Sequence, residues 1–289
     1  MADINKVFNS KIDKWSERGV DEKIECAMDR FEEWISGYNE EEKEILSKLI
    51  SNFNYYSREK AIDAIKKMNE ELERKYSITS DDTIVSIIRK NNGLINSSYE
   101  YWFIHCNQSS LSKNVYYESF DSIDEEEWKN INNVIFIDDC SGTGNQFTNF
   151  LKKQEKDFSN KNIFFLVIEI MEDAEKNIKK YAKENGINIE IIYFTLKKKA
   201  FENKEDNKKL FSNMSHRKQI TDKYILGYKE AQSLMAFYTN TPNDTLGVFW
   251  LLSAKNKPIF ERKKSKEPKW KKIKKEKKGR RKQQYEAKK

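Results

Sequence analysis

Apolar residues in the first part of the chain recur every three or four positions, which is the spacing of one face of a helix. Asn39 and Glu42 have the spacing of a capping box, and Ser57 is a residue type favoured at a helix N-cap. We therefore predict that residues 1–78 form an N-terminal helical region, a small bundle packed on a core domain. The two clearest stripes are Ile45, Leu46, Leu49, Ile50, Phe53 and Ala61, Ile65, Met68, Leu72.

After residue 78 the pattern changes to short apolar runs separated by helix-like segments. The runs predict strands, and the segments 146–156 and 173–184 predict helices, the second closing at Asn185-Gly186. Strands that alternate with helices, and that are apolar on both faces, favour a parallel sheet covered on both sides. We therefore expect an α/β domain over residues 79–262. Its predicted strands are 83–88, 99–104, 134–137, 163–168 and 189–194.

Three segments of this domain are less regular. The acidic stretch 109–132 is interpreted as an excursion over the sheet edge or a flap. Residues 200–222 are polar and predict a helix with a loop, in which His216 and Arg217 are candidates for phosphate contacts. Residues 234–238 read as a buried element.

The composition narrows the class of protein. Of 289 residues, 37% are hydrophobic, and no apolar stretch approaches the ~20 residues of a membrane span. The first residues lack the apolar core of a signal peptide. Three scattered cysteines suit a reducing compartment, so we expect a cytoplasmic protein. With only two histidines, a zinc site is disfavoured.

The net charge of +7 is unevenly distributed. Residues 255–289 hold 18 Lys and Arg against four Glu, whereas the first 254 residues hold 36 basic and 43 acidic residues. We expect residues 263–289 to form a disordered basic tail. Such a tail can release counterions from a nucleic acid, and Trp270 and Tyr285 can stack on exposed bases. A purely solubilising tail is the alternative, and no amphipathic membrane anchor is present.

The most informative segment is residues 134–146, with the sequence VIFIDDCSGTGNQ. An apolar strand ends in paired carboxylates, Asp138 and Asp139. A Gly-rich turn and a helix-like stretch follow. Carboxylates accept hydrogen bonds from ribose hydroxyls or coordinate Mg²⁺, and turn amides hold phosphate groups. The turn residues are Ser141, Gly142, Thr143, Gly144 and Asn145.

Other readings of this segment fit less well. A Walker loop requires a Gly-Lys-Ser/Thr ending, which is absent. A dinucleotide fingerprint requires a third glycine where Phe147 stands. A phosphoaspartate-forming hydrolase requires an Asp where Cys140 stands. An ordinary strand, turn and helix without a ligand remains the simplest alternative.

The segment resembles the phosphoribosyl pyrophosphate (PRPP) loop of type I phosphoribosyltransferases. The resemblance implies a phosphoribosyltransferase-type sheet, with Asp138 and Asp139 as the catalytic pair that orients the ribose and Mg²⁺, and with Ser141 to Asn145 as the cradle of the 5′-phosphate. Two positions depart from the pattern. Gln146 stands where Thr or Ser is usual, and Gly142 replaces an Asp that often handles a purine proton.

A second segment, residues 226–250, contains a Gly227-Tyr228 element and a Thr-Pro-Asn turn at residues 241–243. Together with the variant loop and the helical front part, it resembles the PRTase-CE group of bacterial conflict systems. The resemblance covers most of residues 10–262. It implies a role in antiphage defence, as an effector or toxin encoded beside a sensor protein.

Several functions remain open from the sequence. The first is a phosphoribosyltransferase-fold protein that binds PRPP or a related ribose phosphate with Mg²⁺ and, if it is an enzyme, acts at the anomeric carbon. Arg89, Lys90 and the turn 91–93 are candidates for binding pyrophosphate, and no general base is identifiable. The alternatives are a catalytically inactive nucleotide-sensing regulator and a nucleic-acid-binding adaptor acting through residues 263–289.

Overall fold

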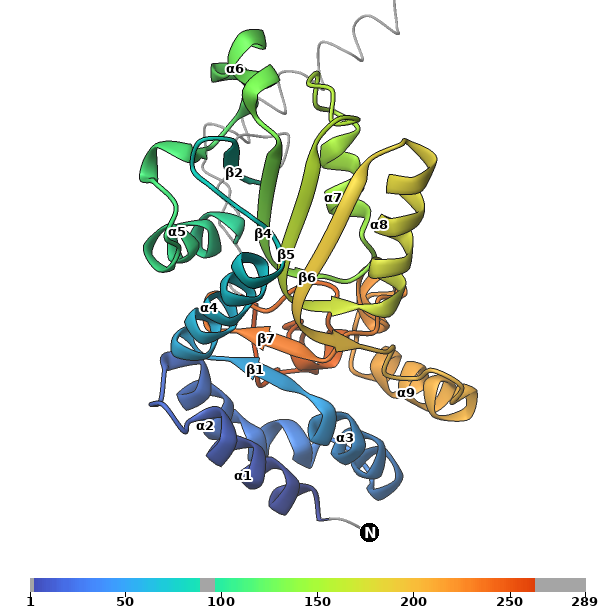
Figure 1. Cartoon of the computed structure of the whole chain (residues 1–289). Coiled ribbons are helices and arrows are strands. Elements are labelled where there is room, and N and C mark those ends of the chain that lie inside the picture. The colour runs from blue at the N-terminus through green and yellow to red at the C-terminus, as the bar shows by residue number, and fades with distance from the viewer. Residues whose placement is uncertain (1–2, 89–96, 263–289) are drawn as a thin grey trace, which may run out of the picture.

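A five-stranded parallel sheet forms the centre of the molecule, with the strand order β3-β2-β4-β5-β6 (Figure 1). The computed structural model describes residues 3–88 and 97–262. Four predicted strands are confirmed as β2, β4, β5 and β6, and the α/β class with a parallel sheet is confirmed with them. The strands are β2 (Thr83–Ile87), β3 (Tyr116–Tyr117), β4 (Asn133–Ser141), β5 (Asn162–Met171) and β6 (Asn188–Lys197).

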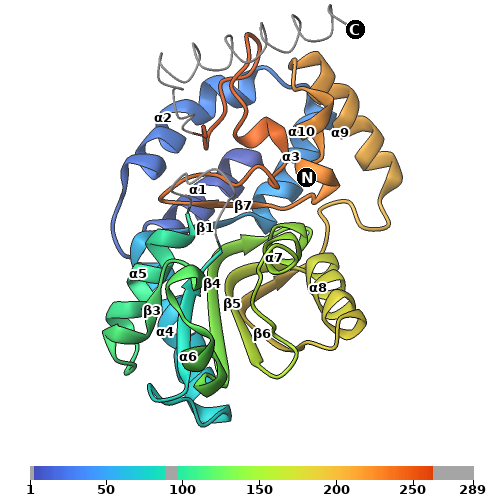
Figure 2. The same cartoon turned by 90° about the horizontal axis from the view of Figure 1, so that it is seen from above.

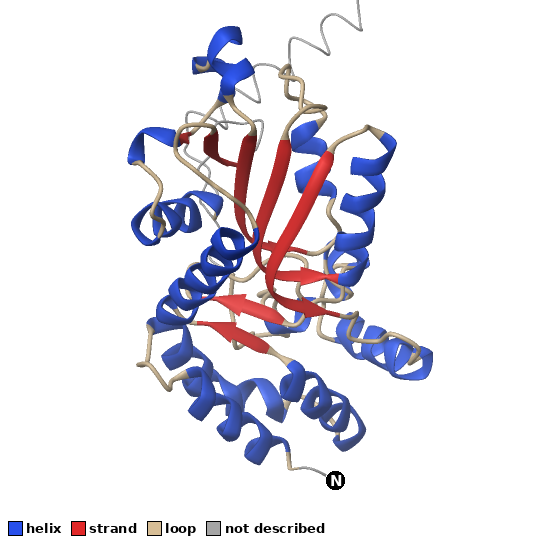
Figure 3. Cartoon of the chain, viewed as in Figure 1, coloured by secondary structure: helices blue, strands red, loops and turns tan. Residues whose placement is uncertain are grey.

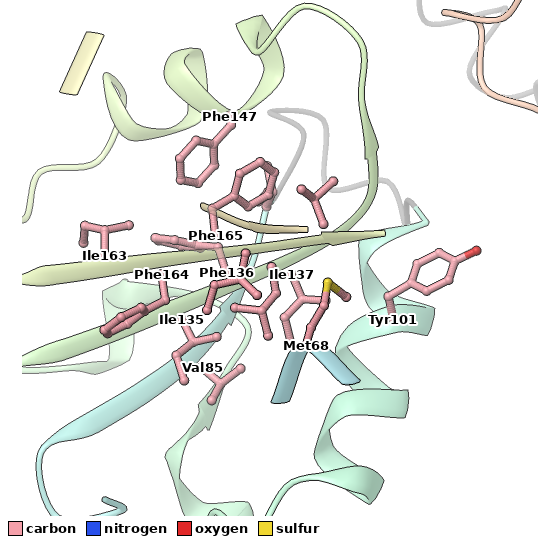
Figure 4. Packing of buried hydrophobic residues seen from close by; sticks show 14 of the residues in the cluster. Met68, Val85, Tyr101, Ile135, Phe136, Ile137, Phe147, Ile163, Phe164 and Phe165 are labelled. Carbon is pink, nitrogen blue, oxygen red and sulfur yellow. The ribbon is translucent and has the colours of Figure 1, made fainter. Parts of the chain in front are cut away.

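Helices cover both faces of this sheet. Helices α4 (Arg58–Lys75) and α5 (Ser98–Gln108) lie on one face, and α7 (Asn145–Leu151) and α8 (Glu172–Glu184) lie on the other (Figure 2). The four residues 134–137 of β4 are completely buried, as expected for a central strand between two helix layers. Phe147 of α7 stacks on Phe165 of β5 with ring centroids 4.3 Å apart (Figure 4).

A second layer lies beyond the carboxyl ends of the large strands (Figure 3). It contains a two-stranded parallel sheet, in which β1 (Asn54–Tyr56) pairs with β7 (Met235–Phe237). Residues 4–55 and 201–260 share one apolar cluster in this layer, so the two ends of the described chain form a common core. Its helices are α1 (Ile4–Trp15), α2 (Glu22–Ser36), α3 (Glu40–Asn52), α9 (Glu205–Arg217) and α10 (Asp222–Ile225).

Short elements complete the architecture. Helix α6 (Glu125–Asn130) and β3 both lie in the acidic stretch 109–132, and β3 is the edge strand beside β2. The remaining elements are single turns of 3₁₀ helix: Lys113–Val115, Phe120–Ser122, Tyr228–Glu230 and Gly247–Phe249.

The predicted caps are confirmed. Asn39 and Glu42 form a complete capping box on α3, and the Ser57 hydroxyl accepts the amide of Lys60 at the start of α4. Helix α8 has Asn185 as its C-cap, and Gly186 follows with φ of 63°, the left-handed conformation that favours glycine at this position.

The strand prediction for residues 99–104 is wrong, because these residues lie within helix α5. Their aromatic and β-branched side chains favour a strand locally. In the fold, however, Tyr101, Ile104 and His105 have the spacing of one helix face and are buried together. The Trp102 indole N–H also donates to the Val85 carbonyl of β2, at 3.3 Å, and attaches the helix to the sheet.

The helix predicted at 146–156 is shorter in the structure and ends at Leu151. Turns follow it, with the amides of Lys153 and Gln154 donating to carbonyls three residues earlier. This change of direction brings Phe158 into an aromatic cluster with Phe120 and Trp128. The helix therefore ends earlier than its local sequence predicts, because Phe158 packs with aromatic residues that are distant in the sequence.

Some predictions concern segments outside the described residues. These are Arg89, Lys90, the turn 91–93 and the basic tail 263–289. Within residues 3–88 and 97–262, no helix is long and apolar enough to cross a membrane.

Candidate functional site

Strand β4 carries Asp138 and Asp139 to the carboxyl edge of the sheet, where parallel α/β folds bind their ligands. Asp138 is 2% exposed and Asp139 is 9% exposed. The Asp138 carboxylate accepts three hydrogen bonds: from the Ser98 hydroxyl at 2.8 Å, from the Gln146 amide group at 3.1 Å and from the Asp139 backbone N–H at 3.0 Å. Asp138 is therefore fixed in orientation on both of its oxygens.

The electrostatics of the pair follow from this burial. Loss of hydration raises the pKa of Asp138 well above its usual value, and the neighbouring Asp139 carboxylate raises it further. The pKa values of the Cys140 thiol and the buried Tyr101 phenol are raised by the same two causes, burial and the Asp139 charge. Asp138 therefore favours its neutral form beside the Asp139 charge, which a cation or a hydrogen-bond donor on a ligand can balance.

The turn after β4 requires glycine at position 144. Gly144 has φ of 74°, and a Cβ atom there would lie 2.9 Å from the Ala174 carbonyl oxygen and 2.9 Å from the Ile178 side chain of α8. The Asn145 side chain donates to the Thr143 hydroxyl at 2.8 Å. Within the described part of the chain, the Thr143 and Gly144 amides donate no hydrogen bond, which leaves them available to an anion.

Gly142 is in contact with a residue a hundred positions away in the chain. A Cβ atom at Gly142 would lie 2.3 Å from the Oδ2 atom of Asp244. The Asp244 charge also contributes to the raised pKa of Cys140. Asp244 thus brings a third carboxylate to the turn, at the very position where the sequence pattern of related loops has an Asp and this chain has glycine.

The Gly227-Tyr228 element packs against the backbone of Asp244 and its neighbour Asn243. Gly227 has φ of 75°, and a Cβ atom there would lie 2.0 Å from the Asp244 carbonyl oxygen. The Tyr228 amide donates to the Asn243 carbonyl at 2.7 Å, and the Ser233 amide donates to the Asp244 carbonyl at 3.2 Å. The two most distinctive motifs of the sequence therefore meet at Asp244.

Helix α5 connects the acidic pair to residues 238 and 239, which precede the Thr-Pro-Asn turn. Ser98 at its start binds Asp138, and the Tyr101 hydroxyl lies 3.1 Å from the Thr239 hydroxyl. Figure 4 shows the Tyr101 hydroxyl pointing away from the apolar cluster. The Tyr238 hydroxyl donates to Glu100 at 2.6 Å. The acidic pair is thereby enclosed by β4, α5 and the chain around residue 240.

The structure brings some of the residues predicted from the sequence into one site and places others away from it. Asp138, Asp139 and the turn 141–145 form one site. His216 and Arg217 belong elsewhere: Arg217 pairs with Glu42 of α3, and the His216 ring lies 3.4 Å from an Asp222 oxygen. The residues that sequence reasoning missed are Ser98, Tyr101 and Asp244. No local signal marks them, because each reaches the site only through tertiary packing.

The donor set of the site can be compared with the needs of Mg²⁺. Among the described residues, no group of three or more His, Cys, Asp or Glu side chains is arranged to hold a metal ion. Both Asp138 oxygens already accept hydrogen bonds, and burial favours its neutral form. Asp139 is the better carboxylate for Mg²⁺, since this ion is often bound by one carboxylate together with ligand oxygens and water.

The parallel sheet, the acidic pair and the glycine turn define a phosphoribosyltransferase-like α/β protein. The family model of PRTase-CE matches residues 31–262, and the chain belongs to this family. Among solved structures, the chain is similar to the Helicobacter pylori xanthine-guanine-hypoxanthine phosphoribosyltransferase, at 12% identity and a TM-score of 0.34, over 54% of this chain and 95% of that one. No curated protein matches the chain.

Proposed function

We propose that the site formed by Asp138, Asp139 and the turn 141–145 binds a ribose phosphate, with PRPP or ribose 5-phosphate as the defining ligands. The observation that carries the proposal is the arrangement of two carboxylates and a glycine turn at the carboxyl edge of β4. Family membership supports it, because the PRTase-CE match includes all of these residues.

Each part of the site has a chemical role in this proposal. Asp138, fixed by Ser98 and Gln146, accepts a ribose hydroxyl in exchange for one of these donors. Asp139 accepts the neighbouring hydroxyl or binds Mg²⁺ together with ligand oxygens. The Thr143 and Gly144 amides bind the 5′-phosphate. Helix α7 has only seven residues, so the turn rather than the helix dipole supplies most of this attraction.

If the protein is an enzyme, the reaction is displacement at the anomeric carbon. Positioning of the sugar supplies most of the rate enhancement in such a reaction. Asp244 is the candidate group for accepting a proton from the attacking acceptor, because its carboxylate lies against Gly142. The Asp244→Asn variant is then expected to keep ligand affinity and to lose turnover.

Calorimetric titration tests the ligand directly. We expect PRPP and ribose 5-phosphate to bind the wild-type chain, more tightly with Mg²⁺ than without it. The Asp138→Asn/Asp139→Asn variant should lose this binding. Asp157→Asn, which changes an exposed acid before the start of β5 at the opposite edge of the sheet, serves as the control. Equal binding by the wild type and the double variant would refute the site assignment.

A catalytically inactive nucleotide-sensing regulator is the second candidate. The observation that favours it is the hydrogen bond from Gln146 to Asp138, because it occupies an oxygen that a reacting ribose would need. Under this alternative, ligand binding is retained and no product forms with any nucleobase. The Gln146→Ser variant has the residue type that is usual at this position of the loop. If it gains affinity or turnover, the Gln146 hydrogen bond limits the wild-type site, which favours the regulator over the enzyme.

The cellular role and the tail are proposed on the family resemblance and the sequence. An effector of antiphage defence should protect cells only when Asp138 and Asp139 are intact, which a plaque assay with its co-encoded genes measures. Deleting residues 263–289 tests the nucleic-acid adaptor. Loss of protection with unchanged ribose phosphate binding would assign the function to the tail instead of the acidic pair.

A further inference from the structure

A cavity separate from the acidic-pair site lies between α3 and the segment that leads from the end of β6 to the start of α9. Helices α3 and α9 contact each other beside it, below the end of β6 in Figure 1. The cavity has a volume of about 230 Å³ and shares no residue with the acidic-pair site.

The lining of this cavity is apolar at its floor and cationic at its rim. Ile45, Leu49 and Phe201 are buried side chains of the floor. Among the described residues, the rest of the lining consists of five lysines, two asparagines, Ala200 and Leu234, and it contains no Asp or Glu. This enrichment stands out because the first 254 residues of the chain are acidic overall. The rim residues are Lys48, Asn52, Lys197, Lys198, Lys199, Lys204 and Asn207.

The ammonium groups of this rim are only partly neutralised. Lys48, Lys198 and Lys199 pair with Glu44, Glu202 and Asp173 at 2.8, 3.2 and 2.9 Å. Surface pairs of this kind are weak and exchange readily for a better anion. Lys197 and Lys204 form no salt bridge with another residue of 3–88 or 97–262. Neither of these two lysines has to give up such a salt bridge in order to bind an anion.

Further positive charge lies next to Lys197. Burial and the charges of Lys197, Lys14 and Lys60 lower the pKa of Lys11 to about 8. The buried Glu169 carboxylate offsets part of this charge, since it interacts with both Lys60 and Lys197. Gathered ammonium groups that depress one another's ionisation are stabilised by an anion.

The start of α9 adds hydrogen-bond donors. Lys204 is its N-cap and makes no side-chain capping bond, so the first amides of this 13-residue helix lack a side-chain acceptor within residues 3–88 and 97–262. Glu205 and Asp206 in the first turn reduce the attraction of the helix dipole for an anion. The lysines therefore supply most of the attraction, and the amide groups of Asn52 and Asn207 supply direction.

We propose that this cavity is a second ligand site, which binds a nucleoside monophosphate. The apolar floor accepts the flat base, the two asparagine side chains pair with its polar edge, and Lys197 and Lys204 bind the phosphate. Pockets that bind drug-sized ligands have volumes of about 300–1,000 Å³. The smaller volume of this cavity suits a single base with its phosphate at the open rim. The inference does not depend on the function proposed for the acidic pair.

Calorimetry with AMP and with inorganic phosphate tests the proposal. Both compounds are titrated into the full chain and into the Asp138→Asn/Asp139→Asn variant, which disables the first site. The test variant is Lys197→Gln/Lys204→Gln. The control is Lys129→Gln/Lys153→Gln, two exposed lysines of α6 and the turn after α7, far from α3 in Figure 1. Thermal denaturation confirms that both variants are folded.

We expect AMP to bind in the Asp138→Asn/Asp139→Asn background and more tightly than inorganic phosphate. Loss of two charge-assisted contacts should weaken AMP binding at least about tenfold in Lys197→Gln/Lys204→Gln, and the control should bind normally. The proposal is overturned if AMP does not bind, or if the Lys197→Gln/Lys204→Gln variant and the control variant bind AMP alike.

A second measurement uses the unmutated chain. AMP should protect Lys197, Lys199 and Lys204 from acetylation by acetic anhydride, as read by peptide mass spectrometry, and Lys129 should react at an unchanged rate. Protection by inorganic phosphate equal to that by AMP would assign the site to a bare phosphate. Unchanged acetylation of all four lysines would overturn it.

Discussion

Single residues in the turn after β4 are constrained both by backbone conformation and by packing. Gly144 has φ of 74° and lies against α8. Gly186 has φ of 63°, but a Cβ atom added there would meet no atom of residues 3–88 or 97–262 within 4 Å, its chain neighbours aside. Substitution of the two glycines therefore distinguishes the cost of a left-handed backbone, which both positions have, from the cost of a steric clash, which only Gly144 has.

We predict that Gly144→Ala lowers the free energy of unfolding by about 2–4 kcal/mol, the sum of a left-handed backbone and an overpacked contact. Gly186→Ala should cost about 1–2 kcal/mol, for the backbone alone. Urea denaturation of both variants measures the difference. Equal losses would mean that α8 moves away from the turn without cost.

The raised pKa of Asp138 predicts a pH dependence of stability. Because the folded pKa lies above the unfolded value of about 3.9, the stability that Asp138 contributes is fully present below about pH 4 and is lost as pH rises through the folded pKa. Asp138→Asn cannot ionise. Its free energy of unfolding should therefore fall less than that of the wild type between pH 4 and pH 8.

Asp157→Asn is the control of opposite sign. The Ser159 amide and hydroxyl lower the pKa of Asp157, so the wild type gains this contribution above the unfolded pKa and the variant does not. Denaturation curves across the pH range compare the three proteins. The same pH dependence in Asp138→Asn and the wild type would contradict the burial argument.

At the scale of elements, the start of α3 contacts α9, so it links the front and rear parts of the described chain in the second layer. Its capping box uses Asn39 and Glu42, and the same Glu42 oxygen that accepts the Asn39 amide also pairs with Arg217 of α9. Helix α6 has an equivalent capping box at Asp124, but it is six residues long and buries only Trp128.

We predict that Asn39→Ala lowers the free energy of unfolding by about 1 kcal/mol, a typical cost of losing an N-cap. Asp124→Ala should cost less than about 0.5 kcal/mol, because a peripheral helix can fray without disturbing the core. Chemical denaturation measures both. A larger loss for Asp124→Ala would show that α6 contributes more to the global fold than its burial indicates.

At the scale of the whole molecule, the two ends of the described chain form a single core. Phe249 is fully buried and packs against Trp34 and Phe53, at ring-centroid distances of 5.5 and 5.0 Å. The Trp34 indole also donates to the Val248 carbonyl at 3.2 Å. The front helices thus depend for their packing on a segment near the other end of the described chain.

We predict that Phe249→Ala lowers the free energy of unfolding by about 3–5 kcal/mol and keeps a single transition, because α1 to α3 lose their partner together with the C-terminal segment. Tryptophan fluorescence and circular dichroism should follow the same urea curve. Two separate transitions would show that residues 1–78 fold as an independent unit.

Local patterns in the sequence were sufficient for most of the architecture. Apolar runs and helical stripes are set by neighbours within a few residues, so β2, β4, β5, β6, α8 and the caps of α3 and α4 could be predicted. The acidic pair and the glycine turn were also visible, because they lie within thirteen consecutive residues of the chain.

Tertiary structure alone decided the features that join distant residues. The aromatic run at 99–104 became a helix because the sheet face accepted Tyr101 and Trp102 in that form. Asp244 reached Gly142, and Lys197 with the lysines that follow β6 met α3, only through contacts between residues about 100 or more positions apart. Sequence periodicity reports which side chains share a face, whereas the meeting of distant faces depends on packing of the whole chain.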